Sequence, residues 1–196
     1  MAVAVDVLAD IHDPAINLAV WQRMLDDALA ADAARLLRFQ CEPLRLELAV
    51  ADVAAALPGA MVAAGWPPAP RIAMDMALLA GCLADVMACA AVSLRLEVIT
   101  GDACRKYHAD QVTARLITSY AGPGSQWLCD GDAAALAAGV SPDQVVPEQL
   151  QPGEVALFKG RRWSATPIIH RSPPIAGTGQ RRLVLVINPA EPECLS

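Results

Sequence analysis

Apolar residues in the first 92 positions recur mostly at helical spacing. Between residues 15 and 39 they fall close to every third or fourth position after the start signal Asp13-Pro14, which predicts an amphipathic helix. A shorter helix is expected over 47–56. The Pro- and Gly-rich segment 58–71 is expected to be a connector, and a further helix is expected over 71–91.

After residue 92 the pattern changes to short segments that alternate with a period of two. Five strands are expected, over 93–100, 112–120, 154–160, 166–172 and 181–188. Turn residues separate these segments and no helical pattern alternates with them, which argues against a parallel nucleotide-binding sheet. We therefore expect an α+β fold in one compact domain. In it the helical residues 1–92 pack on a small antiparallel barrel formed by residues 93–196.

Composition and charge exclude several classes of partner. The formal net charge is −6, so neither nucleic acid nor an acidic membrane surface is expected to bind. The longest apolar run, 72–92, contains Asp75 and Asp85, each of which would cost roughly 3 kcal/mol inside a bilayer. We therefore expect a helix that is buried either on the barrel or against a second copy of the chain, and a homodimer is one of these two alternatives.

The six Cys form no CxxC pair and the acidic start does not resemble an export signal, which predicts free thiols and a cytoplasmic protein.

Two of the three His carry the candidate chemistry. His108 and Asp110 are two positions apart, so on a strand both would face the same side. His170 follows in the apolar segment TPIIHRS. Two imidazoles and one carboxylate leave open positions on a divalent metal, which is the arrangement of non-haem Fe(II) oxygenases. Cys104 is a rival ligand, because a thiolate would favour zinc; the alternative is a small buried residue in a turn.

A cation near this site would suit a 2-oxo acid co-substrate. Arg181 and Arg182 open the last predicted strand, and a guanidinium there could bind the distal carboxylate of 2-oxoglutarate. Neighbouring strand residues face opposite ways, so only one of the two can point inward. We favour Arg182, which shares a face with the small residues Val184 and Val186, although the row of Leu183 and Leu185 remains an alternative. Thr118 and Tyr120 share a face of another predicted strand and are candidates for further hydrogen bonds to the co-substrate.

These motifs resemble those of known families. The order His108-x-Asp110, His170 and an Arg at the start of the last strand, together with PGEVALFKG, is similar to the Fe(II)/2-oxoglutarate-dependent oxygenase superfamily over about residues 100–188. More closely, CRKYHADQVTARLITSYAGPGSQWL and IIHRSPPIAGTGQRRLVLVIN resemble the bacterial domain-of-unknown-function family 1826, from AVWQR at 19–23 to the end. The resemblance implies a double-stranded β-helix of the jelly-roll or cupin type, with His108, Asp110 and His170 as metal ligands.

Three functional hypotheses follow. The first is a dioxygenase of the hydroxylase type that uses Fe(II) and 2-oxoglutarate on an unidentified small-molecule or peptide substrate. The second is a non-catalytic zinc-binding or metal-handling protein that uses the same three residues, with or without Cys104. The third is a metal-free barrel that binds other proteins through its N-terminal helices.

Overall fold

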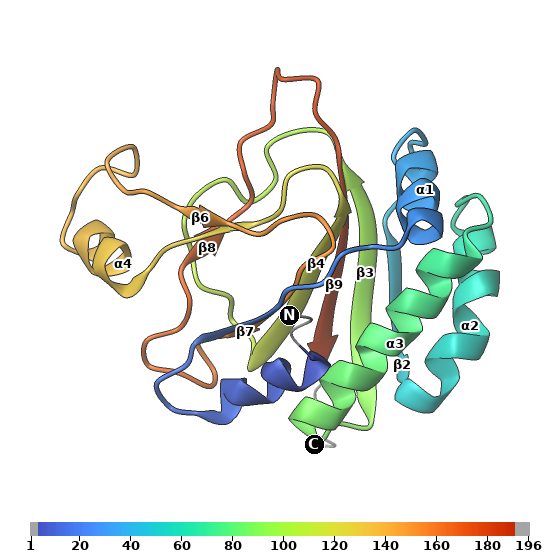
Figure 1. Ribbon diagram of the computed structural model, residues 1–196, viewed down its shortest axis with the longest axis horizontal. Coiled ribbons are helices and arrows are strands. Elements are labelled where there is room, and N and C mark those ends of the chain that lie inside the picture. Colours follow the sequence, from blue (N-terminus) through green and yellow to red (C-terminus); the bar gives the residue numbers. More distant parts are fainter. Residues whose placement is uncertain (1–3, 191–196) are drawn as a thin grey trace, which may run out of the picture.

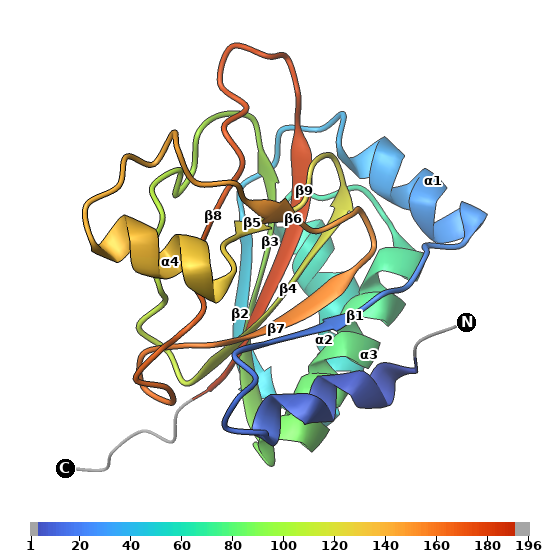
Figure 2. The ribbon, with the colours of Figure 1, turned by 60° about the vertical axis from the view of Figure 1, so that its left-hand side comes forward.

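The computed structural model describes residues 4–190, in which a six-stranded sheet lies between a layer of helices and a second, smaller sheet (Figures 1 and 2). All strand pairs are antiparallel. The larger sheet has the order β1-β7-β4-β9-β3-β2 and consists of β1 (Leu18–Trp21), β2 (Leu44–Ala49), β3 (Ala91–Ile99), β4 (Ala114–Ala121), β7 (Val155–Lys159) and β9 (Arg182–Pro189). The smaller sheet has the order β6-β5-β8 and consists of β5 (Gln126–Trp127), β6 (Glu148–Gln149) and β8 (His170–Arg171).

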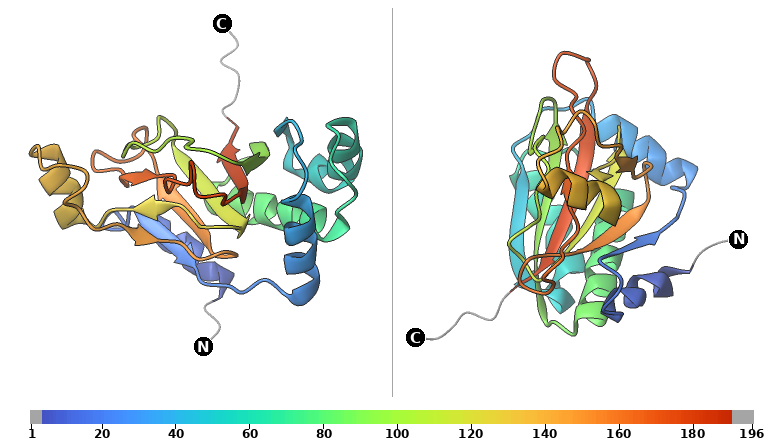
Figure 3. Two further views of the ribbon diagram at one scale, coloured as in Figure 1. Left: turned by 90° about the horizontal axis from the view of Figure 1, so that it is seen from above. Right: turned by 90° about the vertical axis from the view of Figure 1, so that its left-hand side faces the viewer.

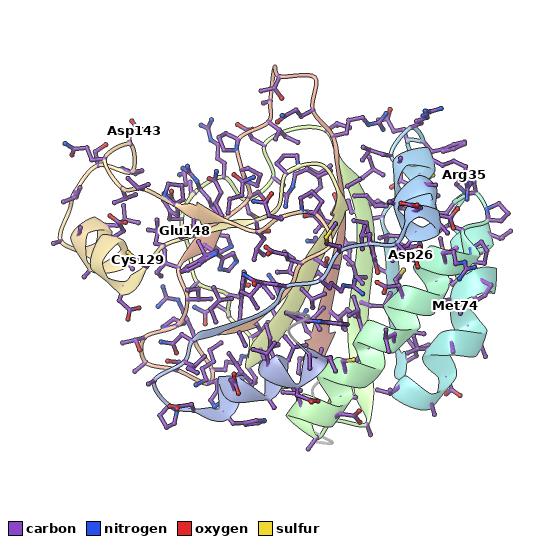
Figure 4. All side chains as sticks on the ribbon, viewed as in Figure 1. Asp26, Arg35, Met74, Cys129, Asp143 and Glu148 are labelled. Carbon is purple, nitrogen blue, oxygen red and sulfur yellow. The ribbon has the colours of Figure 1, made fainter. Side chains whose placement is uncertain are left out.

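Helices occupy both ends of the molecule. The 3-10 helix η1 (Val5–His12), α1 (Asp27–Leu36), α2 (Val50–Ala63) and α3 (Pro70–Met87) cover one face of the larger sheet, and α4 (Asp130–Ala137) lies beside the smaller sheet. Figure 3 shows α4 and α2 at opposite ends. In Figure 4 the labels Arg35 and Met74 mark the end with α1 to α3, and Cys129, Asp143 and Glu148 mark the other. The mixed helical and antiparallel class is therefore confirmed.

The expected barrel does not close within residues 4–190. The larger sheet ends at β1 and β2, and no strand belongs to both sheets. Strand alternation instead gives the larger sheet two buried faces. Leu116, Leu157 and Leu185 pack against the helices, whereas Ile117 and Val186 face the smaller sheet. Each fully buried Leu contributes about 1.5–3 kcal/mol. Because most of the buried apolar side chains lie on the helix-covered face, that face is the main source of stability. The other face forms the candidate site.

The expected helix over 15–39 is wrong in its first half. Residues Leu18–Trp21 form β1, an edge strand paired with β7, and only Asp27–Leu36 are helical. The apolar run LAVW is too short for its periodicity to separate a strand from a helix. The helix starts instead at Asp26, whose carboxylate accepts a hydrogen bond from the Leu29 amide at 2.7 Å.

Two further expectations need correction. Some of the helix expected over 47–56 is β2, in which the sequence LRLELA alternates with a period of two; α2 begins at Val50 and continues through Pro58 to Ala63. The connector is therefore shorter than 58–71. Pro58 is exposed, so the carbonyl that loses its helical partner can face water. Helix α4 was not expected from the sequence.

The later strands are found near their expected places, with different limits. The segment expected over 112–120 begins at Ala114, and of 166–172 only His170–Arg171 is a strand. The strands β1 and β2 come from the first 92 residues and complete the larger sheet, so this part of the chain is not wholly helical as expected. The division of the chain at residue 92 stays a prediction. Helix α3 buries Ile72, Met76 and Leu79 against the sheet. No helix among residues 4–190 combines the length and apolarity needed to cross a bilayer; the cytoplasmic location and the homodimer stay predictions.

Candidate metal centre

The two histidines meet through their backbones. His108 lies in the loop before β4 and not in a strand, but its amide donates to the carbonyl of His170 at 3.0 Å, and the amide of His170 donates back at 2.9 Å. The imidazole ring centroids are 4.6 Å apart. The loop is fixed further by the Ser172 amide, which donates to the Cys104 carbonyl at 3.0 Å. Two segments far apart in the chain therefore present their imidazoles side by side.

Asp110 completes a three-residue group. Its Oδ1 lies 3.6 Å from Nε2 of His108, and its Oδ2 lies 3.3 Å from Nε2 of His170. One ligand atom from each of the three residues lies within 4.8 Å of the others. Donors about 2.1 Å from a shared divalent ion are separated by distances of this order. The structure thus brings together all three side chains that the sequence singled out, in a geometry that could hold an ion.

The donor atoms suit a metal ion in their chemistry as well. Oδ2 of Asp110 is buried and accepts no hydrogen bond from the described residues, so it is an anionic acceptor without a donor. Nδ1 of His108 is 2.8 Å from the carbonyl of Lys106, and Nδ1 of His170 is 3.5 Å from that of Ile168. A carbonyl on Nδ1 favours the tautomer whose Nε2 carries the lone pair, as in most metal-bound histidines.

Electrostatics keep Asp110 ionised. Burial alone raises the pKa of this carboxyl, but its contacts with His108 and His170 and the charge of Arg115 outweigh burial and hold the pKa well below its usual range. The contact with the same carboxylate raises the pKa of His108, although burial opposes this. Asp110 is therefore an anion at neutral pH, as a metal ligand must be.

Arg182 lines the same cavity as the two histidines of this group. The cavity has a volume of about 140 Å³, and its lining includes the apolar side chains of Ile117, Val184 and Val186. The Arg182 side chain is only 1% exposed. None of the ion pairs found among residues 4–190 involves it, and burial lowers its pKa to about 10, so it is still charged at neutral pH. A buried cation without a carboxylate partner is costly, and it favours an anionic ligand.

Neutral groups hold the guanidinium of Arg182 in place. Its Nε donates to the Pro123 carbonyl at 2.6 Å, and its Nη2 lies 3.3 Å from the hydroxyls of Ser119 and Ser125. The turn Gly122-Pro123-Gly124 brings that carbonyl close. A Cβ on Gly122 would overlap the backbone of Arg181, and one on Gly124 would overlap that of Leu150. The glycines are needed because two backbone segments approach each other here.

The other co-substrate candidates lie elsewhere. Arg181 faces the opposite side, where its Nη2 donates to the carbonyl of Phe39 at 2.8 Å. Thr118 and Tyr120 lie on the helix-covered face of β4 and not on the cavity face. The hydroxyl of Tyr120 donates to Asp75 at 2.7 Å. The structure does not bring these three side chains together with the histidines.

Cys104 borders the cavity without joining the three-residue group. It is exposed and lines the cavity near His108, but it is not among the residues whose ligand atoms converge. It is therefore not the small buried turn residue that the sequence suggested as an alternative.

Sequence reasoning missed two residues that support the site, Arg115 and Asn188. Arg115 donates from Nη1 to Oδ1 of Asp110 at 2.6 Å and from Nε to Oδ1 of Asn188 at 3.0 Å. Arg115 shares its face of β4 with Ile117 and Ser119, so the alternation of the strand contained the signal. The alternation could not reveal that the loop before β4 folds back onto the first residues of β4, which brings Asp110 to Arg115.

Comparisons with known proteins identify the family of the chain and a structure with a similar fold. Residues 3–188 match the family described as Protein of unknown function (DUF1826). The chain belongs to this family. A search of the curated proteins found no match. Among solved structures, AviO1 from Streptomyces viridochromogenes Tue57 is similar, with 18% identity, 98% of each chain covered and a TM-score of 0.51. This likeness indicates a shared fold for the DUF1826 chain.

Two further solved structures are more distant. A prolyl-4-hydroxylase from Pseudomonas putida has 13% identity and a TM-score of 0.46, with 94% of this chain and 96% of that chain covered. A full-length Neurospora crassa protein, solved in complex with alpha-KG, has 11% identity and a TM-score of 0.43, with 94% of this chain and 78% of that chain covered.

Proposed function

We propose that this DUF1826 protein is a non-haem Fe(II)- and 2-oxoglutarate-dependent oxygenase of the hydroxylase type, which acts on a small-molecule or peptide substrate. His108, Asp110 and His170 would hold the iron, and Arg182 would bind the distal carboxylate of 2-oxoglutarate. Fe(II) together with a 2-oxo acid activates dioxygen and supplies the oxidising power for the reaction. The chain's own residues supply binding, orientation and the exclusion of water.

One observation carries this proposal: a buried guanidinium without a carboxylate partner among residues 4–190 shares a small cavity with His108 and His170, the two histidines of the three-residue group. A zinc-binding or metal-handling protein would need the two histidines and Asp110, but it would have no use for Arg182. The cavity is small, about 140 Å³, and Ile117, Val184 and Val186 give it an apolar part. A short dicarboxylate has an anionic group for the guanidinium at one end and donor atoms for a metal at the other.

The residues around the cavity have separate tasks in this proposal. Ser119, Ser125 and the Pro123 carbonyl hold Arg182 through Nε and Nη2, and its Nη1 would bind the ligand. The imidazole of His170 packs on Phe158, with ring centroids 4.7 Å apart, which restricts its rotation and keeps water from that side. Cys104 is exposed and borders the cavity, so a substrate could enter on its side.

The proposal is tested by turnover in the absence of a known substrate. Purified protein is supplied with Fe(II), 2-oxoglutarate and dioxygen, and succinate is measured. We expect slow succinate formation that His170→Ala abolishes. His12→Ala is the matched control, because His12 contacts the Val86 carbonyl and is not one of the three converging residues. Zinc that stays bound through purification, with no succinate formed, would favour the zinc-binding hypothesis instead.

A further inference from the structure

Arg115 occupies one of the two oxygens of Asp110. Its Nη1 lies 2.6 Å from Oδ1, which is short even for a charge-assisted hydrogen bond. The other oxygen, Oδ2, is buried and has no hydrogen-bond donor among the described residues. The two oxygens of one carboxylate therefore differ: one is held by the protein, and the other is left facing His170.

Arg115 is itself fixed from its other side. Its Nε donates to Oδ1 of Asn188 at 3.0 Å, so two donors of one planar guanidinium engage two residues in different regions of the fold. Asp110 belongs to the loop before β4, and Asn188 belongs to β9. Because the fork of a guanidinium is rigid, these contacts together set the direction of the Asp110 carboxylate.

Another arginine of the cavity lining, Arg95, shows that charge alone does not require this arrangement. Arg95 also lines the cavity, but its carboxylate partner is Glu97, at 3.5 Å, and both side chains are partly exposed. Arg95 touches none of the three converging residues in the ion pairs of residues 4–190. Arg95 and Arg115 therefore carry equal charge and line one cavity, but only Arg115 contacts the group that would bind a metal.

We infer that Arg115, braced by Asn188, is a positioning residue that holds Oδ1 of Asp110 and leaves Oδ2 alone for the metal. With only one carboxylate oxygen available, more coordination positions stay open for a co-substrate than if both oxygens could bind. This inference rests on the proposed metal site but concerns residues outside it. In this inference the role of Arg115 is to orient the Asp110 carboxylate and not only to neutralise its charge.

The sign of the effect on metal affinity distinguishes the two roles. If Arg115 only neutralised charge, its removal would leave a more negative site and tighten binding of a divalent cation. If it orients Asp110, its removal weakens binding, because partners that orient a ligand typically contribute about 10–100-fold in metal affinity. Asn188→Ala gives a second arm of the test, since it removes the brace without changing any charge.

The experiment uses Co(II), whose visible spectrum reports its coordination. Metal-free full-length protein is titrated with Co(II), and folding of each variant is checked by circular dichroism. We expect Arg115→Met to weaken Co(II) binding by about 10–100-fold and to change the spectrum of the saturated protein. Asn188→Ala should change both in the same direction by less, and Arg115→Lys should restore some of the affinity. Arg95→Met, the matched control, should leave affinity and spectrum unchanged.

Each outcome decides the matter. Unchanged or tighter Co(II) binding by Arg115→Met, with an unchanged spectrum, overturns the inference while the metal site stands. If Arg115→Met does not fold, Asn188→Ala decides alone, and wild-type behaviour of that variant overturns the inference. Failure of the wild-type protein to bind Co(II) at all would overturn the proposed function together with the inference.

Discussion

Replacing Arg182 by Met tests the co-substrate site most sharply. The guanidinium is buried and has no carboxylate partner among residues 4–190, so a bound 2-oxoglutarate would be its main anionic contact. Removal of one partner from a buried, hydrogen-bonded charge pair costs about 2–5 kcal/mol. Since about 1.4 kcal/mol corresponds to a factor of ten, we expect 2-oxoglutarate to bind at least about 30-fold more weakly.

The assay is titration calorimetry of 2-oxoglutarate into protein loaded with Ni(II), which does not react with dioxygen here. Arg181→Met is the matched control: the two arginines are adjacent, but Arg181 contacts the backbone of Arg38 and Phe39 and faces away from the cavity. We expect that variant to bind 2-oxoglutarate as the wild type does. A 2-oxo acid without the distal carboxylate should bind the wild type and Arg182→Met equally. If Arg182→Met kept wild-type affinity, or if Arg181→Met lost it, the assignment of Arg182 would be refuted.

Three further predictions concern the surroundings of the site. Gly160→Ala places a Cβ against the carbonyl of Val112, in the segment that follows Asp110, so it should destabilise the fold by about 1–3 kcal/mol in urea unfolding and lower the affinity for metal. Gly59→Ala, in α2 with nothing nearby, should instead stabilise the fold by about 0.5–1 kcal/mol, and equal effects of the two would contradict this. Tyr120→Phe should lower the free energy of unfolding by about 1–3 kcal/mol, because the buried Asp75 loses a hydrogen-bond donor. The variant should still bind 2-oxoglutarate, and loss of that binding would show that Tyr120 contributes to the co-substrate site. Metal affinity measured against pH should fall by about tenfold per unit once the pH drops below the raised pKa of His108, since the ion must then displace a proton, and a pH-independent affinity would exclude His108 as a ligand.

The class of the fold and several residues of the candidate site could be predicted from the sequence, because the alternation of a strand shows which side chains share a face. Alternation in RRLVLVIN places Arg182 on the same face as Val184 and Val186, and the cavity has this lining. His108, Asp110 and His170 converge as expected, but not for the expected reason, because His108 and Asp110 lie in a loop and not on a strand. Their role as ligands stays a proposal. Strand periodicity is local, so it survives in a single sequence.

What the sequence could not reveal depends on contacts between distant segments. Residues 18–21 carry too few apolar positions to separate a strand from a helix, and only pairing with β7 makes them β1. Asp110 lies in a loop whose path is set by the bridge between His108 and His170. Its partner Arg115 was missed for the same reason. No local pattern shows that α3 supplies Asp75 to the hydroxyl of Tyr120 on the other face of the sheet.

The most direct measurement is the visible spectrum of the protein with Fe(II) and 2-oxoglutarate in the absence of dioxygen. A 2-oxo acid that chelates iron held by two histidines and one carboxylate gives a weak metal-to-ligand charge-transfer band. We predict that this band forms with the wild-type protein, requires both additions and is lost in His170→Ala. A protein that binds Fe(II) at this site but gives no band at saturating 2-oxoglutarate would contradict the account.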